Sequence, residues 1–411
     1  MSTLDTTVET PVVAPERLPA GLAAAIGQVP RGSGARVVLD PHRTRWDVLP
    51  DLLAADRRGA ACLVADPGWS ARERAAVLAD VGDLTEPLPG RPFLLPTTSG
   101  STGRPGVLAR TRASWWLGFA ALGPLPGPVL VPGPPSSTLY LFGALHALHH
   151  GLELRTADRL DPAEIPGGGT VHLVPALLST LLDHRERHPG GPAPAVIVCG
   201  GAHVAPALRE RCARLLPGTT LLEYYGSAEH SLIAIRRDGG PLYPVDGVEP
   251  VLRDGLLWVR SPQSVLGRLS GGVLEPAGPG ATSVGDRAEL HADGSLTVLG
   301  RDSATISTGG TLVAAEEVEQ VLRAVPGVAD VVVAGTPHPS LGALVTAVVE
   351  VSGGGPGRAA LRAAARTGLS PAKRPRRWLG VTALPRLGSG KPARAAVADG
   401  LRDGTLEAET L

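Results

Sequence analysis

Hydrophobic residues in the first half of the chain fall into short runs, and longer segments with helical spacing lie between them. The short apolar runs predict buried strands at residues 37–40, 62–66, 129–132, 171–174 and 195–199. Apolar positions that recur every three or four residues predict helices at 72–81, 136–151, 175–186 and 206–216. Strands that alternate with helices predict an α/β fold in which helices cover a parallel sheet.

From about residue 220 the sequence pattern changes, and runs in which apolar and polar residues alternate appear. Asp254-Gly255 and Asp293-Gly294 each stand between such runs, as in tight β-hairpin turns. Residues 288–292 should pair with 295–299 across the second turn. We therefore expect antiparallel hairpins after the α/β region.

The part of the chain after Gly300 predicts a compact α+β unit. One face of a predicted helix at 314–325 carries Val318, Val321, Leu322 and Val325. The early turns of that helix hold Glu316, Glu317 and Glu319, which the helix dipole favours, and Pro326-Gly327 ends it. Strands at 328–334, 344–351 and 377–381 and a helix at 358–366 complete the unit.

The composition suits a globular, loop-rich protein of two or three domains. The chain has 411 residues, 43% of them apolar, with 53 glycines and 40 prolines. Acidic and basic residues balance at 39 each, so charge gives no reason to expect nucleic acid or an anionic membrane as a partner. We expect a cytoplasmic protein, because the three cysteines lack metal spacing, no signal-like segment opens the chain and no apolar run approaches about 18 residues.

Lysine is nearly absent from this chain. Of the 39 basic residues only two are lysines, Lys373 and Lys391, and the other 37 are arginines. Because most positions that tolerate either cation carry arginine, a remaining lysine is a candidate for chemistry that a planar guanidinium cannot perform.

A hydroxyl-rich and glycine-rich stretch follows the apolar run at residues 93–96. Its backbone N–H and hydroxyl groups can turn toward one centre and bind an anion such as a triphosphate, although a flexible loop is the plain alternative. The two glycines stand too close for the P-loop of kinases, and no Lys-Ser or Lys-Thr pair follows. The residues of this candidate phosphate loop are Thr98, Ser99, Gly100, Ser101, Thr102 and Gly103.

Three further stretches follow the loop in a recognisable order. The second is Gly200-Gly201-Ala202 and, one helix later, Tyr224-Tyr225-Gly226-Ser227-Ala228-Glu229. The third is Gly285-Asp286, a hairpin, Gly300-Arg301 and Gly309-Gly310, and the fourth is residues 385–394 with Lys391. This order and spacing, over residues 90–400, resembles the adenylate-forming superfamily: acyl- and aryl-CoA synthetases, peptide-synthetase adenylation domains and luciferases.

The resemblance implies a reaction and its cofactors. A carboxylate attacks the α-phosphate of ATP, pyrophosphate leaves, and the acyl-AMP passes its acyl group to CoA, with Mg²⁺ as the metal. It also implies a large domain at residues 21–302, with a β-barrel-like part and an abbreviated start, and a small mobile domain at 303–411. Residues 1–20 are polar and proline-rich and are expected to be disordered.

The resemblance assigns a role to each matching position. The phosphate loop would hold the β- and γ-phosphates, Tyr225 would stack on adenine, and Glu229 would bind Mg²⁺. Asp286 and Arg301 would hold the ribose, and Lys391 would bridge the carboxylate and the α-phosphate. The remaining AMP-site positions are Gly201, Ala202, Tyr224, Gly226, Ser227 and Ala228; the acyl site would comprise Tyr140, Gly143, Gly200, Gly201, Gly226 and His230; and the hinge and thiol tunnel would comprise Asp302, Ser303, Gly309 and Gly310.

The chain departs from the family pattern at three points. The lysine that usually follows Pro105 is missing, and Arg104 or Arg110 is a candidate replacement. The family's threonine before the glutamate is Ala228, and its acidic hinge residue is Ser303, with Asp302 beside it. Core packing, strand-end capping and a surface position are the plain alternatives for Tyr225, Asp286 and Arg301.

The sequence does not determine which acid is activated or which molecule accepts the acyl group. We expect an acid–CoA ligase for a small or aromatic acid, with transfer to a carrier protein in trans or to an amine as the alternative. The o-succinylbenzoate–CoA ligases of the family are short in a similar way, so this activity is one candidate. A non-catalytic nucleotide-binding protein is the third reading. His203 is a further candidate for acyl contact, whereas His146, His149 and His150 more plausibly form a half-buried helix face than a metal site.

Overall fold

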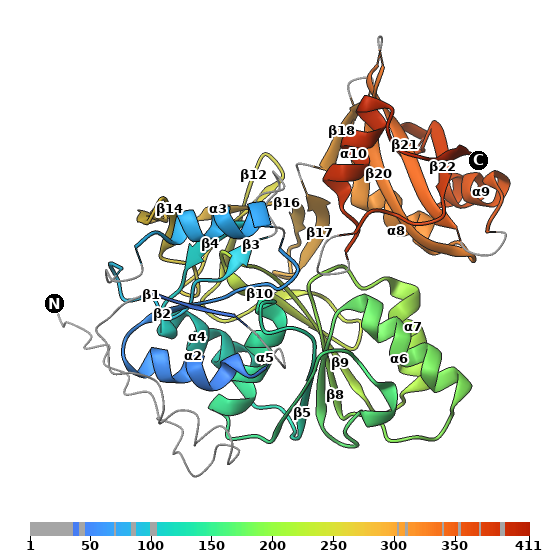
Figure 1. The fold of residues 1–411 in the computed structure, drawn as a ribbon. Coiled ribbons are helices and arrows are strands. Elements are labelled where there is room, and N and C mark those ends of the chain that lie inside the picture. Colours follow the sequence, from blue (N-terminus) through green and yellow to red (C-terminus); the bar gives the residue numbers. More distant parts are fainter. Residues whose placement is uncertain are drawn as a thin grey trace.

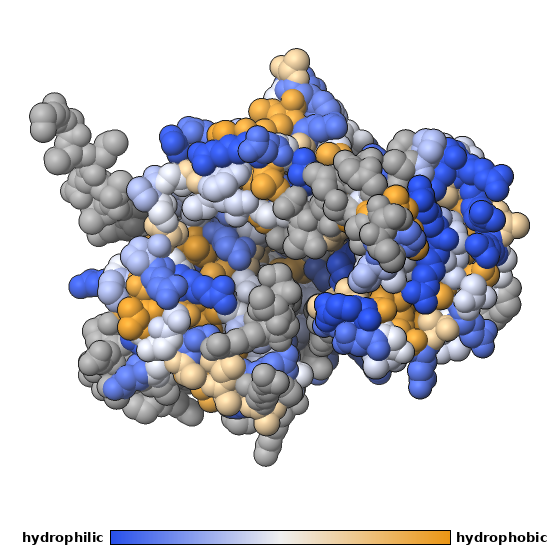
Figure 2. Space-filling model, turned by 90° about the horizontal axis from the view of Figure 1, so that it is seen from above, coloured by the Kyte–Doolittle hydropathy of each residue, from blue (hydrophilic) through white to orange (hydrophobic). Residues whose placement is uncertain are grey.

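The computed structural model of the chain describes residues 36–40, 46–69, 71–83, 88–98, 105–301, 304–308, 311–338, 341–351, 355–369, 371–386 and 391–411. A large domain holds the elements up to β17, and a small domain formed by the elements from β18 onward stands beside it (Figure 1). From above, the surface is hollowed between the two (Figure 2). The expected tail at 1–20 lies outside the described residues.

A seven-stranded sheet forms the centre of the large domain. Five neighbouring strands are parallel, as the alternation of strands and helices predicts, and the last two turn back as hairpins. The order across the sheet is β11 (Tyr243–Pro244), β10 (Ser231–Arg237), β9 (Thr220–Ser227), β8 (Val196–Cys199), β7 (Thr170–Leu173), β5 (Val129–Pro132) and β6 (Leu154–Ala157).

Helices cover both faces of this sheet because alternate strand residues point to opposite sides. Val129 and Val131 of β5 pack with α4 (Arg112–Leu122) and α5 (Thr138–His149). Leu130, between them, packs instead with the cluster that contains α6 (Pro175–Arg187) and α7 (Pro206–Leu215). The active-site candidates therefore come from the ends of strands sandwiched between two helical layers.

Smaller sheets complete the large domain. A parallel pair, β1 (Arg36–Leu39) and β2 (Ala61–Val64), carries α2 (Val48–Arg57), and α3 (Ala71–Val81) packs near β4 and β14. One four-stranded sheet has the order β12 (Glu249–Arg253), β13 (Leu256–Arg260), β16 (Thr282–Leu290), β17 (Leu296–Arg301). The other has the order β15 (Val273–Pro276), β14 (Gly267–Ser270), β4 (Gly106–Ala109), β3 (Thr97–Thr98).

Both predicted hairpin turns are confirmed. Arg253 pairs with Leu256 across Asp254-Gly255, and both turn residues have positive φ, as a type I′ turn requires. Leu290 pairs with Leu296 across the turn that contains Gly294. The register Ala288 opposite Val298 is the predicted pairing of 288–292 with 295–299.

The small domain is a sheet with helices on both faces. Its strand order is β19 (Thr311–Ala314), β18 (Thr305–Thr308), β21 (Gly342–Val351), β22 (Arg377–Val381) and β23 (Glu409–Thr410), and β20 (Val328–His338) also pairs with β21. Val331 and Val333 pack toward α8 (Ala315–Arg323) and α9 (Arg358–Gly368), and Val332 packs toward α10 (Arg394–Asp403). Short 3₁₀ turns lie at Pro162–Glu164 and Pro371–Lys373.

Among the described residues, no helix combines the length and the apolar character that crossing a membrane would need.

Candidate active site

The small domain reaches the large domain through Lys391. Its Nζ donates a hydrogen bond to the backbone carbonyl of Gly201, which follows β8. Gly201 has a φ of +79°, and a Cβ at this position would lie 3.4 Å from Leu139 Cδ1 and 3.8 Å from Lys391 Nζ. Two candidates that stand 190 residues apart in sequence thus meet at the domain boundary.

A second group of candidates meets where β9 passes β16. The hydroxyl of Tyr225 donates to Oδ2 of Asp286. The Asp286 residue is only 5% exposed, and the β16–β17 register sets its backbone opposite that of Arg301. A buried carboxylate with a phenol donor beside it is an acceptor site suited to sugar hydroxyls.

Glu229 lies half-buried in the turn between β9 and β10. Its backbone carbonyl accepts a 2.8 Å hydrogen bond from Val265 N, and the carbonyl of Ala228 accepts a 2.9 Å bond from Arg110. Within the described part of the chain its carboxylate has no hydrogen bond or ion pair. A carboxylate in this state fits Mg²⁺, which typically takes one or two protein carboxylates and completes its shell with phosphates and water. The described residues contain no group of three or more metal-binding side chains.

Arg110 lies beneath the Glu229 turn. Its guanidinium also donates to the carbonyl of Gln263, and it is only 2% exposed. Burial lowers the pKa of Arg110 to about 9, and the charge of Glu229 opposes that shift, so the guanidinium is still a cation at neutral pH. The residue considered as a substitute for the missing loop lysine therefore supports the turn that carries Glu229.

His230 and Ser227 bond to each other within the same turn. Ser227 Oγ lies 2.9 Å from His230 Nδ1, and His230 Nε2 lies 2.7 Å from Thr282 Oγ1. Burial lowers the pKa of His230 and favours the neutral ring. Gly226 is required here, because a Cβ would lie 2.1 Å from the Ser231 carbonyl oxygen. The ring of His230 thus has a structural environment, and its acyl contact stays a prediction.

Three aromatic rings pack directly onto glycines near Gly201. A Cβ on Gly133 would lie 2.0 Å from the Tyr140 ring, and one on Gly200 would lie 2.3 Å from the Tyr224 ring. A Cβ on Gly143, on α5, would lie 2.8 Å from the ring of His172 on β7. We call these contacts the three ring–glycine pairs. They fill the space between α5 and the sheet with flat side chains.

These rings are electrically neutral. Burial lowers the pKa of His172 to about 3 and raises that of Tyr140 to about 12, and it also raises the pKa of Tyr224. His172 is 1% exposed, and neither ring nitrogen has a hydrogen-bond partner. Beside Gly201 itself lies the ammonium of Lys391.

Comparison with known proteins places this arrangement in a family. The model of the AMP-binding enzyme family matches residues 82–256, and that of the AMP-binding enzyme C-terminal domain matches residues 317–391. A probable 2-succinylbenzoate–CoA ligase of Mycobacterium tuberculosis is 32% identical over 329 residues, which cover 74% of this chain and 83% of that protein. The chain belongs to the adenylate-forming superfamily.

Other proteins resemble this chain in sequence or in fold. The acyl–CoA ligase YhfT of Bacillus subtilis, itself uncharacterised, is 27% identical over 78% of this chain and 72% of its own length. The structure of o-succinylbenzoate CoA synthetase from Bacillus subtilis with its acyl-adenylate superposes with a TM-score of 0.78 at 20% identity, covering 92% of each chain. The amide bond synthetase McbA from Marinactinospora thermotolerans gives 0.76 at 23% identity, also over 92% of each. At these identities the structural likeness shows the fold.

Several candidates of this adenylate-forming chain lie outside the described residues. They are Ser99, Gly100, Ser101, Thr102, Gly103 and Arg104 of the phosphate loop, Asp302 and Ser303 at the expected hinge, and Gly309 and Gly310 of the expected thiol tunnel. Thr98 is described and pairs with Gly106 in the β3–β4 hairpin. The roles of all these positions stay predictions.

His203 stands close to the boundary between the domains. Burial lowers its pKa to about 4, with contributions from Arg209 and Arg236 of the large domain and from Arg323 of α8.

The α5 histidines do not resemble a metal site. His146 Nε2 lies 2.8 Å from the carbonyl oxygen of Gly123, and its ring contacts those of Phe119 and Phe142. His149 also contacts Phe119. These contacts belong to a packed helix face.

Two features of the candidate site were not predicted from the sequence: the buried ring of His172 and the hydrogen bonds that Arg110 makes. His172 could have been noticed as a lone imidazole inside a buried apolar run. The partners of Arg110 carried no local signal, because they lie 118 and 153 residues further along the chain.

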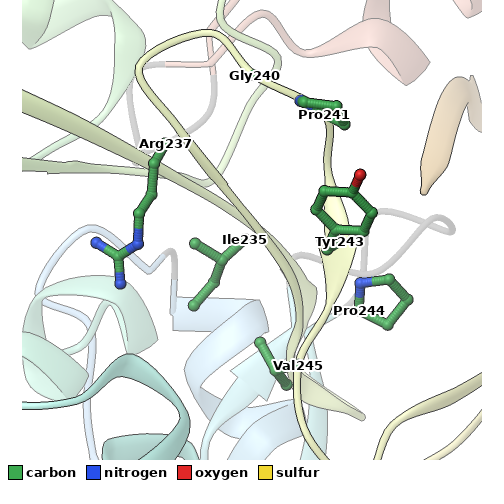
Figure 3. Close-up of a pocket in the computed structure, with 7 residues that line it drawn as sticks. All are labelled: Ile235, Arg237, Gly240, Pro241, Tyr243, Pro244 and Val245. Atoms are coloured by element: carbon green, nitrogen blue, oxygen red, sulfur yellow. The ribbon is translucent and has the colours of Figure 1, made fainter. Parts of the chain in front are cut away.

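A separate surface pocket lies at the β10–β11 hairpin (Figure 3). It is lined by Ile235, Arg237, Gly240, Pro241, Tyr243, Pro244 and Val245. None of these is a candidate site residue, and the lining offers one cation and no carboxylate. We therefore build the function on the domain boundary instead.

Proposed function

We propose that this protein is an AMP-forming acid–CoA ligase for a small and preferably aromatic carboxylic acid that carries no charged group besides the reacting carboxylate. The observation that carries the proposal is the contact of Lys391 with Gly201 across the domain boundary. This contact brings a compact ammonium from the small domain to the strand ends where the nucleotide and acid would meet.

In the first half-reaction a carboxylate oxygen of the acid attacks the α-phosphorus of ATP. A new P–O bond forms, the bond to the β-phosphate oxygen breaks, and pyrophosphate leaves. The ammonium of Lys391 would contact both the attacking carboxylate and the α-phosphate and would stabilise charge on the phosphate in the transition state. In the second half-reaction the CoA thiolate attacks the acyl carbon, and AMP leaves as the C–O bond breaks.

Other residues would hold the nucleotide. Asp286 would accept from the ribose hydroxyls, with Arg301 on the paired strand, and Tyr225 would present its ring to adenine. Glu229 would hold Mg²⁺, which neutralises phosphate charge when bound. The hydrogen bonds that fix the Glu229 turn from behind support this assignment.

The ring–glycine pairs support an uncharged acyl group. An acid with a second carboxylate would bring that charge against the neutral, buried rings of Tyr140, His172 and Tyr224, where desolvation is costly. The substrate named for the 2-succinylbenzoate–CoA ligases carries two carboxylates. We therefore propose a monocarboxylic acid with a flat body.

We also propose a cytoplasmic location, and the state of the cysteines supports it. Cys62, Cys199 and Cys212 are all unpaired and buried, and burial raises the pKa of each. Buried thiols of this kind are ordinary in a reducing compartment.

Transfer of the acyl group to an amine is the second candidate. The fold shared with the amide bond synthetase McbA, over 92% of this chain, motivates it. A carrier-protein thiol supplied in trans is a variant of the first candidate. Both start from the same acyl-adenylate.

The test is pyrophosphate release with Mg²⁺, ATP and a panel of acids that includes benzoate, hydroxybenzoates, 2-succinylbenzoate and octanoate. We expect turnover with benzoate-like monocarboxylates, and a loss of at least about 100-fold in Lys391→Ala. Lys391→Arg should also be impaired, because a guanidinium cannot replace the compact ammonium. The active acid is then offered CoA, a holo-carrier protein or an amine.

Two results would contradict the proposal. One is the absence of ATP-dependent pyrophosphate release with every acid. The other is wild-type turnover in Lys391→Ala, which would favour a non-catalytic nucleotide-binding protein. Preference for 2-succinylbenzoate would overturn the substrate class alone.

A further inference from the structure

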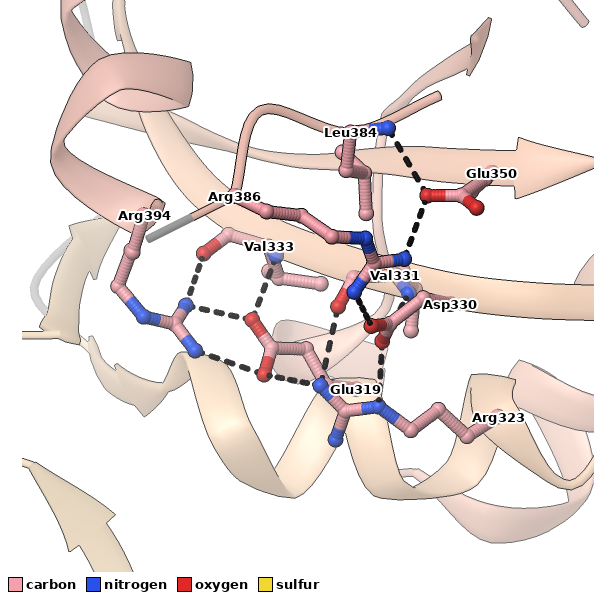
Figure 4. A network of polar contacts seen from close by, with 9 residues as sticks. All are labelled: Glu319, Arg323, Asp330, Val331, Val333, Glu350, Leu384, Arg386 and Arg394. Carbon is pink, nitrogen blue, oxygen red and sulfur yellow. Dashed lines mark hydrogen bonds and ion pairs between the residues drawn. The ribbon is translucent and has the colours of Figure 1, made fainter. Parts of the chain in front are cut away.

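A network of charged side chains surrounds Glu319 in the small domain (Figure 4). Glu319, on α8, is 1% exposed, and its Oε1 accepts a 2.7 Å hydrogen bond from Val333 N. Its Oε2 accepts from Arg394 at 2.7 Å and from Arg323 at 3.2 Å, and Arg394 also donates to Oε1. The buried carboxylate is thus held by two guanidinium groups and one backbone amide.

The network continues to β21 and to the end of β22. Arg323 donates to Asp330 at 3.0 Å, and Arg386 donates to the same carboxylate at 3.2 Å. Arg386 also donates to Glu350 at 2.9 Å, and Glu350 accepts from Leu384 N at 2.9 Å. Three arginines therefore face three carboxylates, and the charges balance.

Two of these arginines flank Lys391 in the sequence. Arg386 precedes it by five residues and Arg394 follows it by three. The chain is closed between them by a bridge from Arg386 to Pro392 and by a 2.7 Å hydrogen bond from Ala393 N to the Pro385 carbonyl. Both ends of the segment that carries Lys391 are thus tied to carboxylates of the sheet and α8.

The attachment at Arg394 is the stronger of the two. Its guanidinium contacts both oxygens of Glu319 in a bidentate pair and donates to the Val333 carbonyl at 3.0 Å. Burial lowers the pKa of Arg394, but the hydrogen bond and charge of Glu319 outweigh it and raise that pKa overall. A lysine could not reproduce this planar fork.

We propose that Glu319 and Arg394, assisted by Asp330 and Arg386, are positioning residues that fix the backbone of the Lys391 segment so that the ammonium can reach Gly201. The inference rests on the proposed function of Lys391. Displacement of a reacting group by about 1 Å can cost about 100-fold in rate, so a fixed segment has kinetic value.

A double-mutant cycle tests this role. With the acid found in the panel, Arg394→Met should lower the rate of pyrophosphate release by about 10- to 100-fold through kcat, with little change in KM for ATP. In a Lys391→Ala background the same change should have almost no further effect, because the group that it positions is absent. A folding defect would instead reduce the active fraction equally in both backgrounds.

Arg323→Met is the matched control. Arg323 contacts Glu319 and Asp330 but neither flanks Lys391 nor binds a residue of its segment. Its removal should change turnover by less than about threefold, because Arg323 is half-exposed and Arg394 still contacts both oxygens of Glu319. Arg386→Met is the second variant, for use if Arg394→Met does not fold, and should show the same dependence on Lys391 with a smaller loss.

A second readout needs no substrate. The chain has only two lysines, so labelling with trace acetic anhydride followed by peptide mass spectrometry reports each ammonium separately. Lys373, held by Glu317 at 2.6 Å, is the internal reference. Arg394→Met or Arg386→Met should raise the labelling of Lys391 several-fold relative to Lys373, and Arg323→Met should not.

The outcomes separate the two hypotheses. Equal effects of Arg394→Met with and without Lys391, or unchanged labelling of Lys391, would overturn the positioning role while leaving the ligase activity intact. Absence of turnover in the wild type would remove the proposed function, and the labelling would then test the fixed segment by itself.

Discussion

At the scale of single residues, the candidate site depends on buried polar groups that hold distant segments together. Arg110 shows this most clearly, because its guanidinium joins the carbonyl of Ala228 to that of Gln263 out of contact with water. A buried carbonyl that loses its donor has no water to replace it. The turn that carries Glu229 therefore depends on a cation that need not touch the nucleotide.

Arg110→Met keeps the aliphatic stem and removes the donors. We expect the free energy of unfolding in urea to fall by about 2–4 kcal/mol, because two buried carbonyls lose their partner. The KM for ATP·Mg²⁺ should rise as the Glu229 turn loosens. Arg155→Met, which breaks an exposed pair with Glu153, should cost less than about 1 kcal/mol. Equal losses in the two variants would contradict this account.

The pair Gly200–Tyr224 gives a second prediction at the residue scale. Gly200→Ala places a methyl group 2.3 Å from the Tyr224 ring, so we expect destabilisation of about 1–3 kcal/mol. In a Tyr224→Ala background the methyl group has room, and the cost should largely vanish. Gly278→Ala, with nothing within 4 Å of the new Cβ, is the control. Additive effects of the two changes, measured by urea unfolding, would show that the ring does not occupy that space.

At the scale of elements, α5 and β7 are joined by histidines that must remain neutral. His146 of α5 and His172 of β7 are both buried, and burial lowers their pKa values to about 4 and about 3. In an unfolded chain a histidine has a pKa of about 6.5. The neutral form is thus required for this packing.

Acid should therefore weaken this packing before other effects appear. Because the folded pKa values lie below the unfolded one, the stabilisation is complete above pH 6.5 and is lost as the pH falls from 6.5 toward 4. Each histidine should contribute a slope of up to about 1.4 kcal/mol per pH unit in the free energy of unfolding. Urea titrations at pH 7.5, 6 and 5 measure it. His172→Gln should reduce the slope by about one histidine's share, and an unchanged slope would refute the assignment.

Elements were predictable where their signal is local. The hairpin at 288–299 was predicted from an Asp-Gly turn with alternating apolar and polar residues on each side of it. Strand β5 was predicted from an isolated apolar run. Helix α4 was not predicted, because its apolar residues, including Trp115 and Phe119, give little contrast between its faces. The end of β9 was recognised as a motif but not as a strand, and β10 was not predicted.

At the scale of the whole molecule, the site is assembled from segments far apart in sequence. The motif order was sufficient to indicate which residues belong together, and the structure brings Lys391 to Gly201 and Tyr225 to Asp286. The motifs did not indicate which other residues hold the site residues in place. Arg110, His172 and the network around Glu319 depend on how sheets and helices pack, which no short stretch of sequence encodes.

The three ring–glycine pairs have a consequence for the history of such enzymes. A larger residue in place of one glycine overfills the space, and a smaller residue in place of its ring leaves a void, so each partner constrains the other. On the proposal that these pairs line the acyl site, lineages that came to accept a different acid would have had to change both partners together or pass through a weakened intermediate. Substrate preference among descendants should therefore shift in discrete steps, with paired replacements as the trace of each step.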